Sequence, residues 1–290
     1  MSRGKRLRKS GMTDPAVKQT DRRGATAAAR RLIVCADDFA TNAAVSTAIL
    51  ELLALQRISA TSCMSDSPRW PVDGAALRER GWQKHAGLHF DLTADFPGRA
   101  GMPLGRLMLA ARCGALAASL VRTALERQLD RYERVMAAAP AFVDGHQHIH
   151  LFPVIREQLF DVLARRYTQR PWLRNLAEIH TPAPLAKRLA LSMMGATGHG
   201  RQAAALGWSG NRGFAGLYAL RPQDGFAERL PHWLSSLPDD GLLMCHPAKQ
   251  AETDDAIGQA RRVEFACLAS AAWPAMLTEH GRVLVAAPLN

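Results

Sequence analysis

Three short polar segments, far apart in the chain, each follow an apolar run typical of a β-strand. They contain Asp37-Asp38, His89 and the run from His146 to His150. Carboxylates and imidazoles are the side chains that bind divalent metals such as zinc. A second carboxylate beside such a site could act as a general base. Together these residue types are the minimum equipment of a metal-assisted hydrolase.

Two of the segments also have a simpler structural interpretation. Asp37 and Asp38 repel each other when both are ionised, and a cation would relieve that repulsion. The alternative is a helix-capping aspartate with a solvated neighbour. In a strand, His89 shares one face with Gly87 and Asp91, opposite a fully apolar face. The alternative for His89 is a histidine buried in the core.

The third segment places imidazoles at alternate positions, His146, His148 and His150. In an extended chain neighbouring imidazoles of this set lie roughly 6.6 Å apart and the outer pair roughly 13 Å apart, so the outer pair cannot share one ion. At most one or two are ligands, and the others orient, donate protons or pack, unless the run is a surface cluster.

His246, at the end of a later apolar run, could be a general acid, or a turn histidine before Pro247.

Strand-like and helical patterns alternate along the chain, which predicts a parallel α/β sheet in a single domain, covered by helices on both faces. Functional sites of such folds lie at the carboxyl ends of the strands, where the polar segments fall. Asn42 is the expected N-cap of the first helix. The strand-like runs lie at 32–36, 58–64, 85–92, 141–145, 172–174, 242–245 and 283–286, and the helical patterns at 43–55, 70–80, 115–138, 153–167, 184–195 and 255–279.

The glycine-rich stretch 195–216 shows neither period, and we interpret it as a loop that covers the site. Its aromatic residues Trp208 and Phe214 could stack on a substrate ring, and Arg212 could bind a hydroxyl or an acidic group. Arg174, at the end of a short strand, would line the same cleft. The alternative is a surface loop with Trp208 packed in the core.

Positive charge is concentrated at the N-terminus. Residues 1–31 hold ten Lys or Arg and two acids, a net charge of +8 out of +11 for the 290 residues, so the rest carries only +3. We therefore expect residues 1–30 to be a disordered basic tail and 31–290 to be the folded domain. A near-neutral body does not favour a nucleic-acid partner.

The cysteine pattern predicts neither a disulfide scaffold nor a structural zinc site, because there are five cysteines and no CxxC pair. A reducing cytoplasmic location is the natural expectation. The sequence has no 18-residue apolar run, so no transmembrane segment is expected. The basic start lacks the apolar core of a secretory signal, while an organellar transit peptide stays open.

Taken in order, the motifs resemble those of the YdjC-like carbohydrate deacetylases, the ChbG/HpnK group, over residues 31 to 287. The resemblance rests on 36–40, 87–89, 144–150 and 246–248. It implies a distorted parallel (β/α) barrel that removes an acetyl group from an N-acetylated sugar or glycoconjugate. Two positions depart from the family pattern, because Ala40 and Ala248 replace glycines and would be strained if either needed a positive φ.

The resemblance also implies roles for the site residues. Asp38, His89 and His146 would bind one divalent metal, Mg or Zn, whose bound water is the nucleophile. Asp37 would be the base and His246 the acid. The expected substrate is a small molecule or an oligosaccharide, and the candidates to contact it come from the loop, the short strand and the histidine run rather than from the resemblance. These candidates are Arg174, Trp208, Arg212, Phe214, His148 and His150.

Two rival functions use the same residues. A non-haem iron oxygenase also binds its metal with two histidines and one carboxylate, but it needs an oxidant. A sugar- or lipid-binding protein with a degenerate site is the non-catalytic alternative, and the intact set of candidate ligands argues against it. The oligomeric state is left open, with a homodimer as one option.

Overall fold

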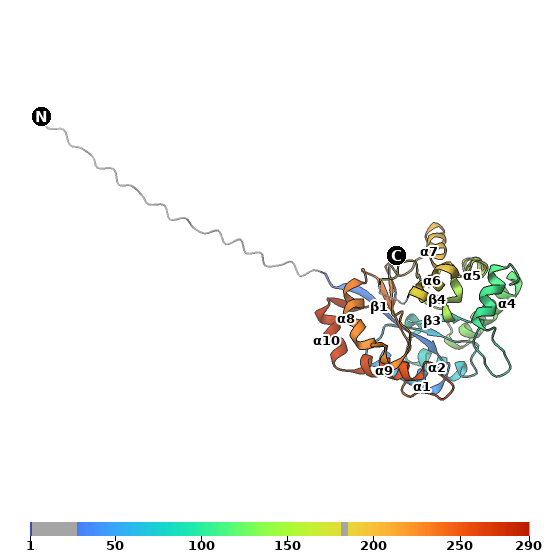
Figure 1. Cartoon of the computed structure of the whole chain (residues 1–290), viewed down its shortest axis with the longest axis horizontal. Coiled ribbons are helices and arrows are strands. Elements are labelled where there is room, and N and C mark those ends of the chain that lie inside the picture. Colours follow the sequence, from blue (N-terminus) through green and yellow to red (C-terminus); the bar gives the residue numbers. More distant parts are fainter. Residues whose placement is uncertain (2–27, 181–184, 290) are drawn as a thin grey trace.

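The computed structural model describes Met1 and residues 28–180 and 185–289, which form one domain around a parallel sheet of eight strands (Figure 1). The strand order is β5-β4-β3-β2-β1-β7-β6, with β8 paired to β1, and every pairing is parallel. The strands are β1 (Arg30–Phe39), β2 (Ala60–Cys63), β3 (Ala86–Phe90), β4 (Phe142–Gly145), β5 (Trp172–Leu173), β6 (Phe214–Ala215), β7 (Gly241–Cys245) and β8 (Arg282–Leu284). The predicted α/β class with a parallel sheet is confirmed.

Strand β1 is the central and longest strand. It pairs with β7 along one edge, and along the other edge with β8 near its start and β2 near its end. The stretch from Leu32 to Ala36 is fully buried and apolar, as expected for a strand covered on both faces. The end of β5 and the chain after it meet the chain around β6 through bridges from Leu173 to Gly210 and from Ile179 to Phe214. The sheet therefore curls into the half-open, distorted barrel that the resemblance implied.

Helices surround this sheet (Figure 1). Asn42 caps α1 as expected, accepting a hydrogen bond from the Val45 amide at 2.9 Å. The predicted helix at 255–279 is two helices, separated at Ser270, whose backbone is extended. The helices are α1 (Ala43–Ala54), α2 (Trp70–Glu79), α3 (Leu104–Arg112), α4 (Ala118–Met136), α5 (Pro153–Arg166), α6 (Leu185–Met194), α7 (Ala196–Ala205), α8 (Phe226–Ser236), α9 (Gly258–Ala269) and α10 (Ala272–Glu279).

The expectation of a loop over the whole stretch 195–216 is wrong, because its first half is α7. The glycines there serve close packing rather than flexibility. A Cβ on Gly198 would lie 2.8 Å from Arg156 Nη1, and one on Gly200 would lie 2.7 Å from the Cβ of Ala177. Glycine is disfavoured inside helices, so the sequence pattern hid a helix that tertiary contacts stabilise.

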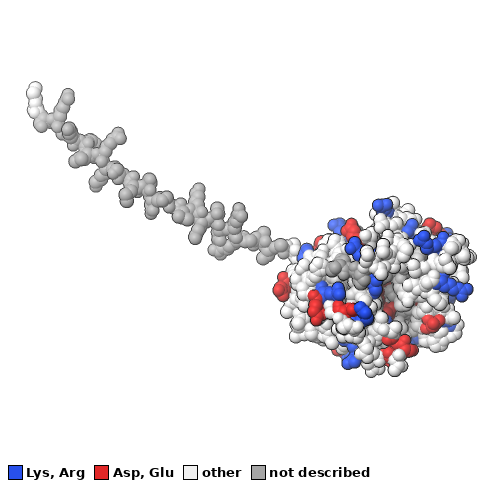
Figure 2. Space-filling view, viewed as in Figure 1, with Lys and Arg blue, Asp and Glu red and all other residues white. Residues whose placement is uncertain are grey.

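The surface of the domain shows no single-sign face in the view of Figure 2, where basic and acidic side chains are interspersed. Residues 2–27, which hold most of the predicted tail, lie outside the described residues. Arg30, the last residue assigned to that tail, is already the first residue of β1. Within the described part of the chain, no helix is long and apolar enough to cross a membrane. All five cysteines are free.

Candidate metal and catalytic site

A cavity of about 680 Å³ lies at the carboxyl ends of β1, β3, β4 and β7, and we call it the main cavity. The strand-end residues that line it come from four separate parts of the chain. They are Asp37, Asp38, His89, His146, His148 and His246. Parallel strands explain this convergence, because their carboxyl ends all meet at one edge of the sheet.

An irregular end of β1 lets two adjacent carboxylates face this cavity. Side chains normally alternate between the faces of a strand, but the pairing of β1 with β2 shifts between Ala36 and Phe39. Asp38 and Ala40 both have left-handed backbones, with φ of 67° and 74°. Ala40 thus occupies a conformation that costs an L-residue roughly 1–2 kcal/mol. Ala248 does not have a positive φ, so only one of the two glycine replacements is strained.

Three potential metal donors meet at this strand end. The Oδ1 atom of Asp38 lies 3.4 Å from His89 Nε2 and 3.1 Å from His146 Nδ1, and the three donor atoms lie within 4.8 Å of one another. His89 Nδ1 donates to Asp144 Oδ1 at 2.6 Å, which turns its Nε2 toward Asp38. A carboxylate behind a histidine is the usual support of a metal-binding imidazole. The donor set therefore fits one divalent cation.

The electrostatics of His89 agree with that fit. Burial alone would lower its pKa, but the Asp144 carboxylate outweighs burial and raises the pKa to about 10. Without a cation the ring carries a proton between two carboxylates, and a divalent metal would take the place of that proton. Burial would raise the pKa of Asp38, but Arg261 and the two imidazoles hold it well below its usual value.

Asp37 is held by an arginine. Arg174, fully buried, donates to both carboxylate oxygens of Asp37 at 2.6 Å and lies 2.6 Å from Asp144 Oδ2. This pairing outweighs the effect of burial and lowers the pKa of Asp37, so the carboxylate is ionised. Arg174 was expected to contact substrate, but it does not line the main cavity. Its place is behind Asp37, where it compensates two buried acids.

His246 faces Asp37 from the end of β7. Its Nε2 lies 4.0 Å from Asp37 Oδ2, and its side chain is only 12% exposed. Burial lowers the pKa of His246 to about 4, although Asp38 and Asp37 act in the opposite direction. The imidazole is therefore neutral at pH 7 and presents a hydrogen-bond donor or acceptor to the cavity.

The histidine run is not extended. Residues His146–Leu151 form a short 3₁₀ segment, and Gln147 and His148 have left-handed backbones. The spacing expected for an extended chain therefore does not apply. His148 lines the main cavity, whereas His150 is buried beneath it, with Nε2 3.2 Å from the carbonyl oxygen of Arg174. Phe214 is fully buried in β6 and meets the ring of His148 edge-on.

Trp208 and Arg212 lie outside the main cavity. They line a separate hollow of about 310 Å³ beside α7, which we call the Trp208 cavity. The Trp208 ring is 8% exposed, stacks on Phe160 and lies under the guanidinium of Arg170. The structure places both residues apart from the acidic pair, and we therefore expect Trp208 to pack in the core, which was the alternative interpretation, rather than to contact substrate.

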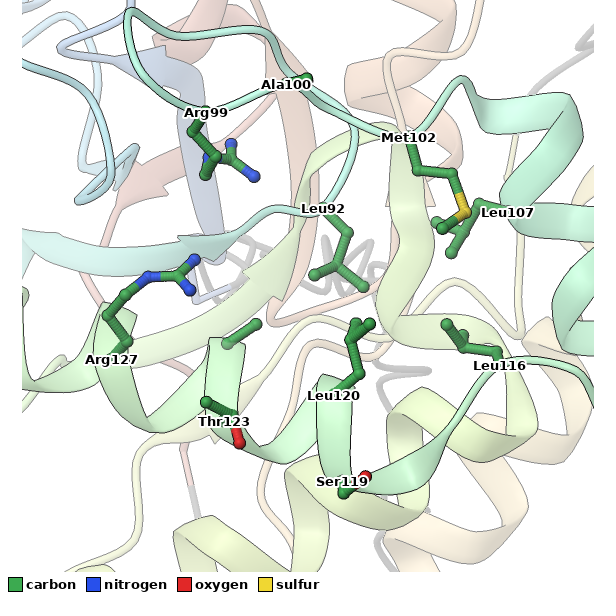
Figure 3. A pocket seen from close by; sticks show the side chains of 11 residues that line it. Leu92, Arg99, Ala100, Met102, Leu107, Leu116, Ser119, Leu120, Thr123 and Arg127 are labelled. Atoms are coloured by element: carbon green, nitrogen blue, oxygen red, sulfur yellow. The ribbon is translucent and has the colours of Figure 1, made fainter.

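The loop after β3 is anchored next to a third hollow, of about 480 Å³, shown in Figure 3. Arg99 and Arg127 lie at one side of this hollow, and Leu92 and Leu120 line its apolar part. Arg99 pairs with Asp91 and bonds the carbonyl oxygen of Ala94. This pairing fixes the segment whose next residues, 95–97, form a wall of the main cavity.

Three buried charged residues support the site without having been predicted as site residues. Asp144 supports His89, Arg261 donates to Asp38 Oδ2 at 2.7 Å, and Glu264 accepts from the backbone amide of His246. The sequence offered a sign that Asp144 belongs to the site, because it lies at a strand end just before the histidine run. Arg261 and Glu264 lie on the buried face of α9. Charged residues in the apolar stripe of a helix are the sequence feature that could have indicated their role.

The protein is a parallel α/β barrel whose strand ends bring together two histidines and one carboxylate that could hold a metal ion, beside a second carboxylate paired with an arginine. The profile of the YdjC-like protein family matches residues 31–279, and the chain belongs to this family. The resemblance inferred from the motifs is thereby confirmed.

Curated relatives cover part of this region. A mouse protein named carbohydrate deacetylase is 29% identical over 49% of this chain and 50% of its own length. An Escherichia fergusonii protein named chitooligosaccharide deacetylase is 32% identical over 47% of this chain and 54% of its own length. The chain spans about half the length of the curated relatives it matches.

A solved structure shows the same fold across nearly the whole domain. A crystal structure from Enterococcus faecalis V583, described as a candidate cellobiose-phosphate cleavage protein, superposes with a TM-score of 0.64. The match covers 89% of this chain and 97% of that chain, at 17% sequence identity. At that identity the likeness establishes the fold alone.

Proposed function

We propose that this protein is a metal-dependent deacetylase that hydrolyses the acetamide of an N-acetylated sugar or oligosaccharide. The observation that carries the proposal is the convergence of Asp38, His89 and His146 in one cavity, beside Asp37 and His246. The names of the mouse and Escherichia fergusonii relatives support the substrate class.

In this proposal Asp38, His89 and His146 hold the cation. When bound, a divalent cation supplies Lewis acidity, polarising the acetamide carbonyl and lowering the pKa of a water molecule. Two imidazoles suit zinc, while a single carboxylate with open positions also suits magnesium. Arg261 already occupies the second oxygen of Asp38, which leaves Oδ1 for the ion.

Asp37 is the proposed general base. Its carboxylate is ionised and borders the cavity, so it can accept a proton from the attacking water. Arg174 keeps both of its oxygens in fixed positions and does not itself reach the cavity. Because Arg174 lowers the pKa of Asp37, this carboxylate is a weak base. A bound cation would compensate by lowering the pKa of the attacking water.

His246 is the proposed acid and oxyanion donor. Its Nε2 lies 4.0 Å from Asp37 Oδ2, and the ring is neutral at pH 7. A neutral imidazole can donate a hydrogen bond to the developing oxyanion, and it can transfer to the leaving amine the proton that Asp37 takes from the attacking water. His148, on the same cavity wall, is the proposed substrate contact of the histidine run.

An acetate-release assay tests the proposal. Metal-free protein is incubated with N-acetylglucosamine and its β-1,4 oligomers, with Zn²⁺, Mg²⁺ or EDTA. Release of acetate that needs an added metal is the expected result. No acetate from any of these sugars under any metal would contradict the proposal. Oxygen consumption by the Fe²⁺-loaded protein would favour the iron-oxygenase alternative instead.

A further inference from the structure

Helix α9 touches both halves of the site through its buried face. Arg261 and Glu264 are three residues apart and so point the same way. They are 5% and 0% exposed, although Arg and Glu are rarely buried unless paired. Arg261 lines the main cavity, whereas Glu264 does not.

Arg261 bridges two carboxylates. Its Nη2 donates to Asp38 Oδ2 at 2.7 Å and its Nε donates to Asp255 Oδ2 at 2.7 Å. The other oxygen of Asp255 accepts from the Ile257 amide at 3.0 Å, just before α9 begins. The guanidinium therefore connects the first turn of α9 to the candidate metal ligand, and it selects which oxygen of Asp38 faces His89 and His146.

Glu264 holds the other half of the site. One of its oxygens accepts from the backbone amide of His246, and the other accepts from the hydroxyl of Tyr218. Two residues further on, the Ala248 amide donates to the carbonyl oxygen of Arg261 at 3.1 Å. The His246-Pro247-Ala248 segment is thus fixed to α9 on both sides of its proline.

We propose that α9 positions the reacting groups of the site, with Arg261 orienting Asp38 toward the cation and Glu264 fixing the backbone that carries His246. Both are positioning residues, because Arg261 acts through Asp38 and Glu264 through His246. The inference deepens the proposed function and rests on it for the roles of Asp38 and His246. Helix α9 would thus fix the positions of the reacting groups, although it contributes none of the proposed metal ligands.

Arg261→Lys tests the first half of the proposal. Lysine keeps the positive charge but has one nitrogen and cannot reproduce the planar guanidinium bridge to Asp38 and Asp255. Titration of metal-free protein with ZnCl₂ by calorimetry should show binding weakened about 10-fold or more, as is typical when a residue behind a metal ligand is changed. The neighbouring exposed Arg262→Lys is the matched control and should bind like the wild type. Wild-type affinity in Arg261→Lys would overturn this half.

Glu264→Met and Glu264→Gln test the second half. The methionine fills similar space but accepts no hydrogen bond from His246, so kcat should fall about 10-fold or more, with KM and Zn²⁺ affinity unchanged. Burial raises the pKa of Glu264 to about 7, and glutamine mimics its protonated form, so Glu264→Gln should keep most activity. Unchanged kcat in the folded Glu264→Met protein would overturn this half.

A spectroscopic measurement covers the case in which Glu264→Met does not fold. In protein labelled with ¹⁵N-histidine, the His246 amide proton, assigned through His246→Gln, should resonate downfield because it donates to a carboxylate. Glu264→Gln should move it upfield, and an unmoved resonance would contradict the bond. Neither calorimetry nor this shift depends on turnover. If the wild type released no acetate, the proposed function would fail while these two measurements still decided the positioning role.

Discussion

The main cavity and the Trp208 cavity differ in how their polar groups are held. In the main cavity, Asp37 and Asp38 are each paired with a buried arginine and each lie within 4.0 Å of an imidazole nitrogen. The Trp208 cavity has one acidic residue among its described lining, Glu178, and its aromatic ring is covered by a phenylalanine and an arginine. Chemistry-bearing residues therefore gather where several parallel strands end, whereas an aromatic residue near glycines can simply pack.

A compensated buried charge is therefore a stronger sign of function here than an aromatic residue in a glycine-rich stretch. Placing Asp37, Asp38 and Asp144 in the interior is costly unless each is compensated. The fold provides Arg174, Arg261 and His89 for that purpose. An arrangement this costly is retained at a reactive site more often than elsewhere.

The largest expected effect is at Asp37. Asp37→Asn removes the proposed base while keeping its shape, so kcat should fall 10²–10⁴-fold, the range typical of general bases. Zn²⁺ affinity should stay within a few-fold of the wild type, because Asp37 is not a proposed ligand. Kinetics of acetate release and calorimetry measure the two quantities. The exposed Asp130→Asn on α4 is the control, and loss of metal from Asp37→Asn would exchange the roles of Asp37 and Asp38.

The Trp208 cavity should respond in stability rather than in catalysis. Trp208→Ala removes a ring stacked on Phe160, and the free energy of unfolding should fall by about 3–5 kcal/mol, the usual cost of such a truncation. KM should be unchanged in the folded fraction. Urea unfolding and steady-state kinetics measure these, with the exposed Leu206→Ala as the control. A raised KM with unaltered stability would move substrate contact into this cavity.

Acid should weaken the packing around His199, which lines the Trp208 cavity. His199 is fully buried against Phe160, and burial lowers its pKa to about 4 from an unfolded value near 6.5. The unfolded chain therefore binds more protons between these values, so this contribution to stability is complete above pH 6.5 and is lost as the pH falls toward 4. The loss should be on the order of 3 kcal/mol.

The control for this pH effect is His199→Phe, which removes the titrating ring. Urea unfolding at pH 7.5 and pH 5 should show a smaller difference between the two pH values in the variant than in the wild type. An equal pH dependence in both proteins would show that His199 does not contribute to it.

The smallest effect is expected at the N-terminus. Deleting residues 2–27 should leave the melting temperature and acetate release unchanged, because their composition offers too little apolar surface to offset the entropy of ordering. Deleting residues 2–33 is the contrasting change, because it removes the first four residues of β1 and should prevent folding. A large loss of stability on the shorter deletion would show that the basic segment docks on the domain.

Much of the fold was readable because its signals are local. Apolar runs such as 32–36 and 242–245 gave the central strands, and Asn42 gave the start of α1. Where one residue serves a distant contact, the local signal misled. The glycines of α7 indicated a loop, although they pack closely against Arg156 and Ala177.

The sequence alone indicated that carboxylates and imidazoles follow strands, because residue type and strand period are local properties of the chain. Which of these residues meet depends on the folded structure. The irregular end of β1 brings Asp37 and Asp38 to one cavity, and Arg174 proves to be the partner of Asp37 rather than a cleft residue. The tertiary structure also brought Arg261 and Glu264 of α9 to the site. Pairing across more than 100 residues has no local trace, because it depends on which strand ends and helix faces the sheet places side by side.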